Sequence, residues 1–354
     1  MPIYNHFRYT EKDDHIIIRA YCGDDVDVIV PDMIKGKPVR EISPHAFVPE
    51  SDQWYVGGQD SKKHCLNRAR SIRLPDTIQR LEAAFACCFE LEEITLPCNA
   101  ELIGSDNFQL CHALKAIYVD SNNPSYMSRN GMLYSKDGKR LLRCPSDHAI
   151  DSNDYLDGVE VIGPSAFEFC KNLLTIEIPE FVRRVESSAF ANCRNLKSVQ
   201  LHEEIHLVDT IHFWCCSSLD NVIYYNAEGI IPRGEFCHCK NLKNIDIRSK
   251  IRIIGEHAFS DTGLIDFVVP TGTSAINAHA FLQCFSLKSI VIPRSTSRIH
   301  KNAFTGCGKN YYTEEQCADI HTTFGMDPAT TFIVIPGSKA EAFCQAQGYT
   351  ILHP

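Results

Sequence analysis

A phenylalanine that recurs at an almost fixed interval constrains this chain more than any other feature of its sequence. Residues 159–179 contain the pattern Ala-Phe-x-x-Cys-x-x-Leu-x-x-Ile-x-Ile-Pro, and the same pattern returns along most of the chain. A fixed period of this length is typical of solenoid proteins, in which each repeat packs only on its neighbours. The repeated phenylalanines, nearly all 23 residues apart from position 167 onward, are Phe47, Phe85, Phe108, Phe167, Phe190, Phe213, Phe236, Phe259, Phe281 and Phe304.

Each repeat predicts a short strand, a compact edge and a second extended piece. Leu173, Ile176 and Ile178 are spaced as in a strand whose aliphatic side chains face inward. Pro179, which cannot donate a ladder hydrogen bond, belongs at the end of that strand. The Ala-Phe-x-x-Cys segment predicts a compact turn or a single helical turn at the opposite edge. Together these segments predict a β-rich repeat fold.

Cysteine is the second repeated residue, and its pattern indicates reduced core thiols. In the Phe259 copy the cysteine position holds Thr262, with no compensating change elsewhere. A disulfide partner could not be replaced singly by threonine, whereas a small buried side chain could. We therefore expect free thiols, which fit a reducing compartment. Eight of the 17 cysteines lie three residues after a repeat phenylalanine: Cys88, Cys111, Cys170, Cys193, Cys216, Cys239, Cys284 and Cys307.

Two interruptions of the period predict insertions, and the two ends predict caps. Asp137-Gly138 between two apolar runs favours a β-hairpin. Ser338, with Glu341 three residues later, is typical of the start of a helix, and Gly348 of its end. The expected organisation is an N-terminal cap with the first repeat (1–47), an insertion loop (48–68), repeats (69–119), a β-hairpin insertion (120–158), repeats (159–307) and a C-terminal cap with a short helix (308–354).

Composition narrows the function classes. The formal net charge of -9 leaves no basic excess to neutralise phosphates, so we expect no nucleic-acid partner. No apolar run of about 18 residues occurs, so no membrane span is expected. The first residues show no signal-peptide pattern, which predicts a cytoplasmic protein, or a secreted or surface protein if the chain is a trimmed form. Phosphate-binding glycine loops and nucleophile-elbow motifs are absent, and we expect no cofactor.

One enzyme motif is present, the pentad His202-Glu203-Glu204-Ile205-His206. In zinc peptidases both histidines of such a pentad lie on one face of a helix, with the glutamate as base. Here the pentad follows a predicted strand, and His202 stands where Pro179 stands in the preceding copy, so a turn is expected instead. A zinc-dependent hydrolase or metal-binding protein that uses His202, Glu203 and His206 is therefore only the alternative hypothesis.

The outward strand face is the better candidate for function. The residue between the two inward aliphatics of each strand should point outward, and these residues change from polar to apolar toward the C-terminus. Exposed apolar residues with aromatics suit a protein partner or a homo-oligomeric contact, although strand propensity alone could also have placed them. Trp54, in the first insertion, belongs either to a functional loop or to a surface flap. The outward residues are Arg73, Thr95, Tyr118, Glu177, Gln200, Ile223, Asp246, Val268 and Val291, with Tyr224 and Tyr225 beside Ile223.

The repeat resembles the BspA-type leucine-rich repeat. Residues 161–170 (Val-Ile-Gly-Pro-Ser-Ala-Phe-Glu-Phe-Cys) and 253–259 (Ile-Ile-Gly-Glu-His-Ala-Phe) carry the likeness, which extends over about residues 26–307. The resemblance implies a curved, right-handed leucine-rich-repeat solenoid, here of about ten repeats of 23 residues with two insertions and terminal caps. It implies no catalytic residues, because the family's motif residues are packing residues. The expected function is a non-enzymatic protein–protein interaction scaffold, with adhesion or host interaction as its narrower form.

Overall fold

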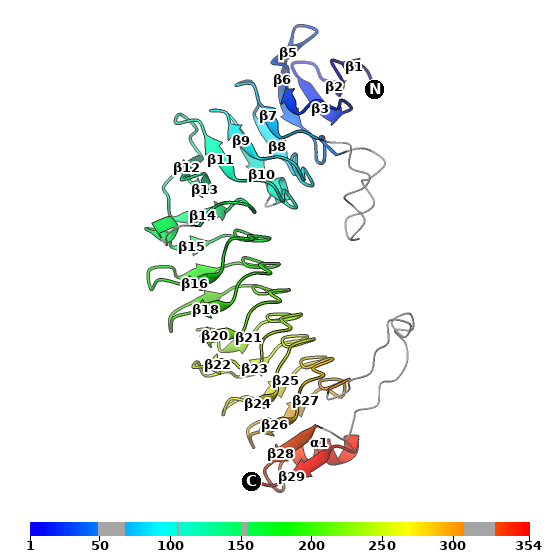
Figure 1. Ribbon diagram of the computed structural model, residues 1–354, viewed down its shortest axis with the longest axis vertical. Helices are drawn as coiled ribbons and strands as arrows, with labels where there is room; N and C mark the ends of the chain where they lie inside the picture. Colours follow the sequence, from blue (N-terminus) through cyan, green and yellow to red (C-terminus); the bar gives the residue numbers. More distant parts are fainter. Residues whose placement is uncertain (49–67, 105, 151–153, 308–329) are drawn as a thin grey trace. The chain divides into compact units, whose positions relative to one another are not determined.

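The computed structural model describes residues 1–48, 68–104, 106–150, 154–307 and 330–354. The chain divides into two compact units, Met1–Asn172 (unit 1) and Leu173–Pro354 (unit 2), each treated by itself below. Both units are stacks of short, mostly parallel strands joined by turns, so the predicted β-rich solenoid is confirmed (Figure 1). Trp54 and the other residues of 49–67, together with residues 308–329 of the expected C-terminal cap, lie outside the described residues.

Unit 1 begins with an antiparallel β-meander and continues as a parallel stack. One sheet has the order β1-β2-β3-β6-β8-β10, with β5 beside β6, and a second has the order β11-β9-β7-β4. The strands are β1 (Ile3–Tyr4), β2 (Phe7–Glu11), β3 (Ile16–Tyr21), β4 (Asp27–Ile29), β5 (Met33–Ile34), β6 (Lys37–Ile42), β7 (Ser71–Arg73), β8 (Arg80–Glu82), β9 (Glu93–Leu96), β10 (Glu101–Ile103), β11 (Ala116–Val119), β12 (Tyr126–Arg129), β13 (Met132–Ser135), β14 (Arg140–Arg143) and β15 (Val161–Ile162); Asp106–Phe108 and Asp154–Leu156 are short 3-10 helices.

The segment in which the sequence predicted a hairpin holds three antiparallel strands. β13 and β14 pair across the Asp137-Gly138 turn, β12 adds to β13, and β14 then pairs in parallel with β15. Buried Asn123 anchors the start of the segment, because its amide donates to the carbonyl oxygens of Pro97 and Ala100, each at 3.0 Å. The hairpin is thus tied to the preceding turn rather than attached only at its ends.

Buried Arg143 joins the turns on either side of that hairpin. Its guanidinium donates to the carbonyl oxygens of Phe108 at 3.2 Å, Ser165 at 2.7 Å and Glu168 at 3.3 Å. Between the Phe108 and Phe167 copies no Ala-Phe turn intervenes, so these carbonyls would otherwise face a gap in the stack. Five fixed N–H donors make arginine suited to this place.

Unit 2 continues the parallel strands. The sheet orders are β16-β18-β20-β22, β21-β23-β25-β27 and β24-β26-β28-β29, and β17 pairs with β19. The predicted helix is confirmed: Ser338 Oγ accepts the amide of Glu341, and Gly348 ends the helix at φ 70°. No described helix has the length and apolarity needed to cross a membrane. The elements are β16 (Thr175–Glu177), β17 (Arg184–Val185), β18 (Ser198–Gln200), β19 (His206–Leu207), β20 (Asn221–Tyr224), β21 (Ile230–Ile231), β22 (Asp246–Ile247), β23 (Ile253–Ile254), β24 (Asp266–Val268), β25 (Ala275–Ile276), β26 (Ser289–Ile292), β27 (Arg298–Ile299), β28 (Thr331–Val334), α1 (Lys339–Gln347) and β29 (Thr350–Leu352).

Stacked phenylalanine rings form the centre of both units. In unit 1, Phe85 stacks between Phe47 and Phe108 at centroid distances of 5.7 Å. In unit 2 the rings from Phe190 to Phe304 stack at 5.2 to 5.6 Å with small interplanar angles. Such offset stacks add to the free energy of burying the rings. The predicted inward residues Leu173, Ile176 and Ile178 are also buried.

The repeated cysteines are free and buried, as the sequence predicted. Several thiols donate to the phenylalanine carbonyl of the preceding turn: Cys216 Sγ to Phe190 and Cys239 Sγ to Phe213, each at 3.1 Å. Thr262 fills the same position, but its hydroxyl donates within its own turn, to the Phe259 carbonyl at 2.8 Å. A small side chain with one donor is therefore what this position requires.

The edge that carries each phenylalanine is a compact turn. In unit 2 the backbone is left-handed two residues before the phenylalanine (Ser188, φ 59°) and two residues after it (Asn192, φ 60°). The amides of Ser188, Phe190 and Asn192 consequently donate to carbonyls of the next turn at 3.2, 2.9 and 2.7 Å. Backbone hydrogen bonds thus connect successive turns along this edge as well as along the strands.

We expect Phe236→Ala to destabilise unit 2 by about 3–5 kcal/mol, because it removes a fully buried ring from the middle of the stack. Phe181→Ala is the matched control, since the Phe181 side chain is 44% exposed and should cost far less. Denaturant unfolding followed by circular dichroism measures both. Equal losses for the two variants would contradict a central role for the stack.

Candidate functional site

The outward residues predicted from the sequence differ in exposure. Ile223, Tyr225 and Val291 are only half-buried. Tyr224 was wrongly placed on the surface: its side chain is buried and its ring meets Phe236 edge-on at 5.4 Å. Tyr224 stands eleven residues after its repeat phenylalanine, which is the inward position that Ile178 fills after Phe167. The exposed residues are Arg73, Thr95, Tyr118, Glu177, Gln200, Asp246 and Val268.

Strand register in unit 2 brings four outward apolar residues into one row. Val268 pairs with Val291, Val291 with Ile333, and Ile333 with Leu352, across β24, β26, β28 and β29 (Figure 1). Val268 is 66% and Leu352 56% exposed, while Val291 and Ile333 are half-buried. We call these four residues the apolar row. Sequence reasoning missed Ile333 and Leu352, because their strands lie beyond the point where the repeat pattern fades.

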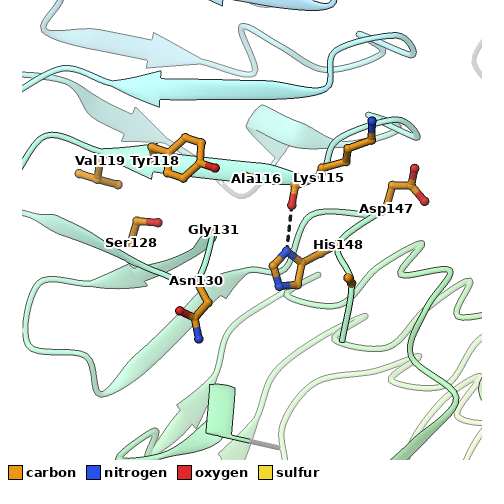
Figure 2. Close-up of a pocket in the computed structure, with 10 residues that line it drawn as sticks. Lys115, Ala116, Tyr118, Val119, Ser128, Asn130, Gly131, Asp147 and His148 are labelled. Carbon is orange, nitrogen blue, oxygen red and sulfur yellow. Dashed lines mark hydrogen bonds between the residues drawn. The ribbon is translucent and has the colours of Figure 1, made fainter. Parts of the chain in front are cut away.

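A second feature of the strand face is a pocket of about 660 Å³ in unit 1. Figure 2 shows Tyr118 and Val119 of β11 on one side, with Ser128 and Asn130 of the insertion opposite. The pocket thus joins a predicted outward residue, Tyr118, to the predicted hairpin insertion. Its remaining lining residues are Lys115, Ala116, Gly131, Asp147, His148 and Ala149.

Hydrogen bonds hold the walls of this pocket together. His148 Nδ1 lies 2.8 Å from the carbonyl oxygen of Lys115 (Figure 2). The Ser128 hydroxyl donates to the Ile117 carbonyl at 2.7 Å, and the Ile117 amide donates to the Gly131 carbonyl at 2.7 Å. Gly131 is required here, since its φ is 80° and a Cβ would lie 2.9 Å from the Ala116 Cβ. The insertion is therefore pinned against β11.

The His-Glu-Glu-Ile-His pentad does not form a zinc-peptidase site. It lies in a turn that leads into β19, as predicted, and not on a helix. His202 Nε2 contacts the Val182 carbonyl oxygen at 2.8 Å, whereas His206 Nδ1 contacts Glu228 Oε1 at 2.8 Å. The two rings therefore have separate protein partners, and the geometry offers no support for the hydrolase alternative.

Potential metal ligands converge elsewhere in unit 2. Within the described residues, ligand atoms of Glu256, His257 and His279 all lie within 4.8 Å of one another, and each residue is half-buried. The two imidazole rings are 4.9 Å apart between centroids. Burial and the neighbouring His279 ring lower the pKa of His257, so its imidazole is neutral at neutral pH. The sequence did not suggest this group, because its residues share no short motif.

A buried ion pair replaces two alanines of the repeat. His212 and Glu235 directly precede Phe213 and Phe236, where most copies have alanine, and both side chains are 0% exposed. His212 Nδ1 lies 2.7 Å from Glu235 Oε2, and His212 Nε2 lies 2.9 Å from the Val208 carbonyl. The Val208 carbonyl only accepts, so His212 Nε2 donates to it; with Glu235 as a carboxylate, Nδ1 also donates, as in a protonated imidazole. Burial by itself lowers the pKa of His212, but Glu235 outweighs it and the pKa is raised.

A sequence signal for this pair existed. Ala166, Ala189 and Ala258 mark the position in neighbouring copies, and only adjacent copies could contact each other there. Opposite charges at one repeat position in two consecutive copies therefore indicated a pair. Asn107 offers a neutral parallel: it holds the same position before Phe108, and its side chain accepts the Ala84 amide at 3.1 Å.

Comparison with known proteins agrees with the repeat geometry. The chain matches the sequence profile described as "BspA type Leucine rich repeat region (6 copies)" over residues 61–131, 146–231 and 229–322, which is more than half of its length. The chain belongs to the BspA-type leucine-rich repeat family. The recurrent Ala-Phe turns and Cys-x-x-Leu strands of both units are thus the family's packing residues. No curated protein sequence matches the chain.

Three solved structures of bacterial proteins are similar to this chain to different degrees. A leucine-rich repeat protein from Eubacterium ventriosum is 20% identical with a TM-score of 0.66, covering 83% of this chain and 80% of that one. The pneumococcal vaccine antigen PcpA is 16% identical with a TM-score of 0.48, covering 99% and 98%. A leucine-rich cell surface protein from Faecalibacterium prausnitzii is 18% identical with a TM-score of 0.43, covering 96% of each chain. At 20% identity the likeness to the Eubacterium ventriosum protein concerns the fold alone.

Replacing one member of the buried pair should destabilise the protein more than replacing both members. We expect His212→Ala or Glu235→Ala to cost about 3–5 kcal/mol of unfolding free energy, because each leaves an unpaired buried charge. The double variant restores the alanine of neighbouring copies and should cost less than the sum. Chemical denaturation of the four proteins gives the coupling energy, and additive losses would contradict the pair.

The pair should also make stability depend on pH. A histidine whose pKa is raised in the folded state stabilises the folded protein. This stabilisation is fully present below the unfolded histidine pKa of about 6.5. That contribution is lost as the pH rises from there through the raised pKa of His212. We therefore expect the stability of the natural protein, relative to the His212→Ala/Glu235→Ala variant, to fall as the pH rises above about 6.5. An advantage that grows with pH would contradict this sign.

Proposed function

We propose that this protein is a non-enzymatic protein-interaction scaffold whose strand face in unit 2 binds a protein partner through the apolar row. The observation that carries the proposal is the continuous register from Val268 to Leu352. Neighbouring strands are about 4.8 Å apart, so four rungs present an apolar strip about 14 Å long. A strip of this length matches one face of a short helix or an extended segment.

Magnitudes favour the apolar row over the charges of the same face. Fully burying a valine or leucine side chain contributes about 1.5–3 kcal/mol. An exposed ion pair such as Asp246 with Arg248 contributes about 0–1 kcal/mol. The row therefore supplies most of the affinity for a partner, and the polar rows beside it supply orientation. Interface centres with this division are common in protein complexes.

The narrower forms of the proposal concern which protein binds. Adhesion to a host or neighbouring cell rests on the family resemblance, and a homo-oligomer rests on the self-complementarity of an apolar strip. The packing role of the repeat motif residues supports a non-enzymatic protein. Where the protein works is part of the same question, and buried protonated thiols such as Cys111, whose pKa burial raises to about 12, suit a reducing compartment.

The test is a comparison of captured partners. Purified full-length protein and the Val268→Asp/Val291→Asp variant serve as baits for cell lysate and for extracellular-matrix extract. We expect the variant to lose the proteins that the natural bait retains, because two carboxylates in the row would have to be desolvated on binding. Quantitative mass spectrometry measures the loss, and analytical ultracentrifugation detects self-association that the variant abolishes.

The matched control is Leu174→Asp/Phe181→Asp, which places the same charges at exposed apolar residues of unit 2 that lie outside the row. Control and natural bait should retain the same proteins. Equal retention by the Val268→Asp/Val291→Asp variant would remove the apolar row from the function.

A further inference from the structure

Two histidines of unit 2 occupy the same position in consecutive turns. His257 and His279 each lie two residues before a repeat phenylalanine, with left-handed backbone at φ 55° and 57°. The same conformation at the same position is taken by Ser165 and Ser188 at φ 53° and 59°. Since the position is equivalent in each turn, the two imidazoles come from one edge of the stack, with ring centroids 4.9 Å apart.

Within the described residues, the ring nitrogens of these two histidines have no hydrogen-bond partner, whereas each of the other described histidines of unit 2 has at least one. His238 Nδ1, for example, lies 2.7 Å from Asp261 Oδ2, and His300 Nδ1 accepts the Asn302 amide at 3.2 Å. His202, His206, His212 and His353 also have partners in the protein. The imidazoles of His257 and His279 are thus available as ligands.

Glu256 adds a carboxylate to the two imidazoles. Its Oε1 lies 3.9 Å from His257 Nε2, while its Oε2 faces Arg233 Nε at 3.6 Å. One carboxylate oxygen is therefore directed toward the histidines, and the other is held by an exposed arginine. Ligand atoms of all three residues lie within 4.8 Å of one another. Metal–nitrogen bonds of about 2.0–2.1 Å place tetrahedral ligand atoms about 3.4 Å apart, so these atoms must approach by about 1.5 Å at most, which side-chain rotation can provide.

We propose that Glu256, His257 and His279 form a binding site for a divalent transition-metal ion of the zinc class. Imidazole nitrogens suit zinc, copper and nickel, and a single carboxylate oxygen completes a set of three protein ligands. Three ligands leave a coordination position for water or for a donor atom from a bound molecule. Because the ligands come from two turns, a bound ion joins those turns and stabilises unit 2. The site is independent of the apolar row.

Zinc titration of the full-length protein tests the site. Exposed thiols are first blocked with N-ethylmaleimide, since free cysteines such as Cys22 would also take up zinc, and metal is removed with chelator. Isothermal titration calorimetry with zinc chloride should then show one site of micromolar affinity or tighter, and calorimetric unfolding should show a rise in melting temperature. Cobalt(II) provides a second readout, because its visible absorption responds to inner-sphere ligands.

Serine variants separate this site from unspecific binding. The variants His257→Ser and His279→Ser introduce serine, which Ser165 and Ser188 show to fit this left-handed position. Folding should therefore persist, and circular dichroism checks this. We expect each variant to weaken zinc binding roughly a hundredfold. Loss of a residue that only orients a metal ligand already costs up to about that factor, and these variants lose a ligand itself. The matched control His202→Ser/His206→Ser should leave the zinc affinity and the zinc-induced rise in melting temperature unchanged. The proposal is overturned if the natural protein binds no zinc, if the His257→Ser and His279→Ser variants bind zinc as tightly as the natural protein, or if the control variant loses zinc binding.

Discussion

Contact between the phenylalanine of one turn and that of the next is the interaction on which the rest of the structure depends. The rings from Phe47 to Phe108 and from Phe190 to Phe304 are buried and stack within a narrow range of distance, 5.7 Å in unit 1 and 5.2 to 5.6 Å in unit 2. This spacing is close to the separation of hydrogen-bonded strands, so ring stacking and backbone pairing favour the same rise per turn. Strand register, the cysteine ladder and the compact turns can therefore repeat without strain accumulating along either unit.

Departures from the repeat are tolerated when a hydrogen bond or an ion pair compensates. Thr262 replaces a cysteine and its hydroxyl donates to the Phe259 carbonyl of its own turn, so the position selects a small side chain with a donor rather than sulfur. His212 and Glu235 replace two alanines together, since either charge alone would be buried without a partner. Arg143 lies in the interruption between the Phe108 and Phe167 copies and donates to carbonyls on both sides of it. For the ion pair and for Arg143, the neighbouring turns decide what the position can hold.

Function is best sought where stacking places no demand on the side chain. Outward strand positions are one such class, and they become the apolar row in unit 2. The position two residues before each phenylalanine is another, because it is constrained in backbone conformation but not in side chain, and it presents His257 and His279. Alternation along the strands predicted the first class, including Val268 and Val291. It failed for Tyr224, which occupies an inward position eleven residues after Phe213 and was read as a surface aromatic.

The sequence by itself determined the repeat, its period, the inward residues, the reduced thiols and the closing helix, because all of these follow from spacing along one strand or one turn. Tertiary structure alone decided which residues of different turns meet. The register across strands extended the apolar row to Ile333 and Leu352, which lie where the repeat pattern is no longer present in the sequence. Adjacent turns brought together His212 with Glu235, and His257 with His279, over 23 and 22 residues of chain. Contacts between turns depend on how the turns stack. A sequence pattern specifies only which residues each turn presents for those contacts.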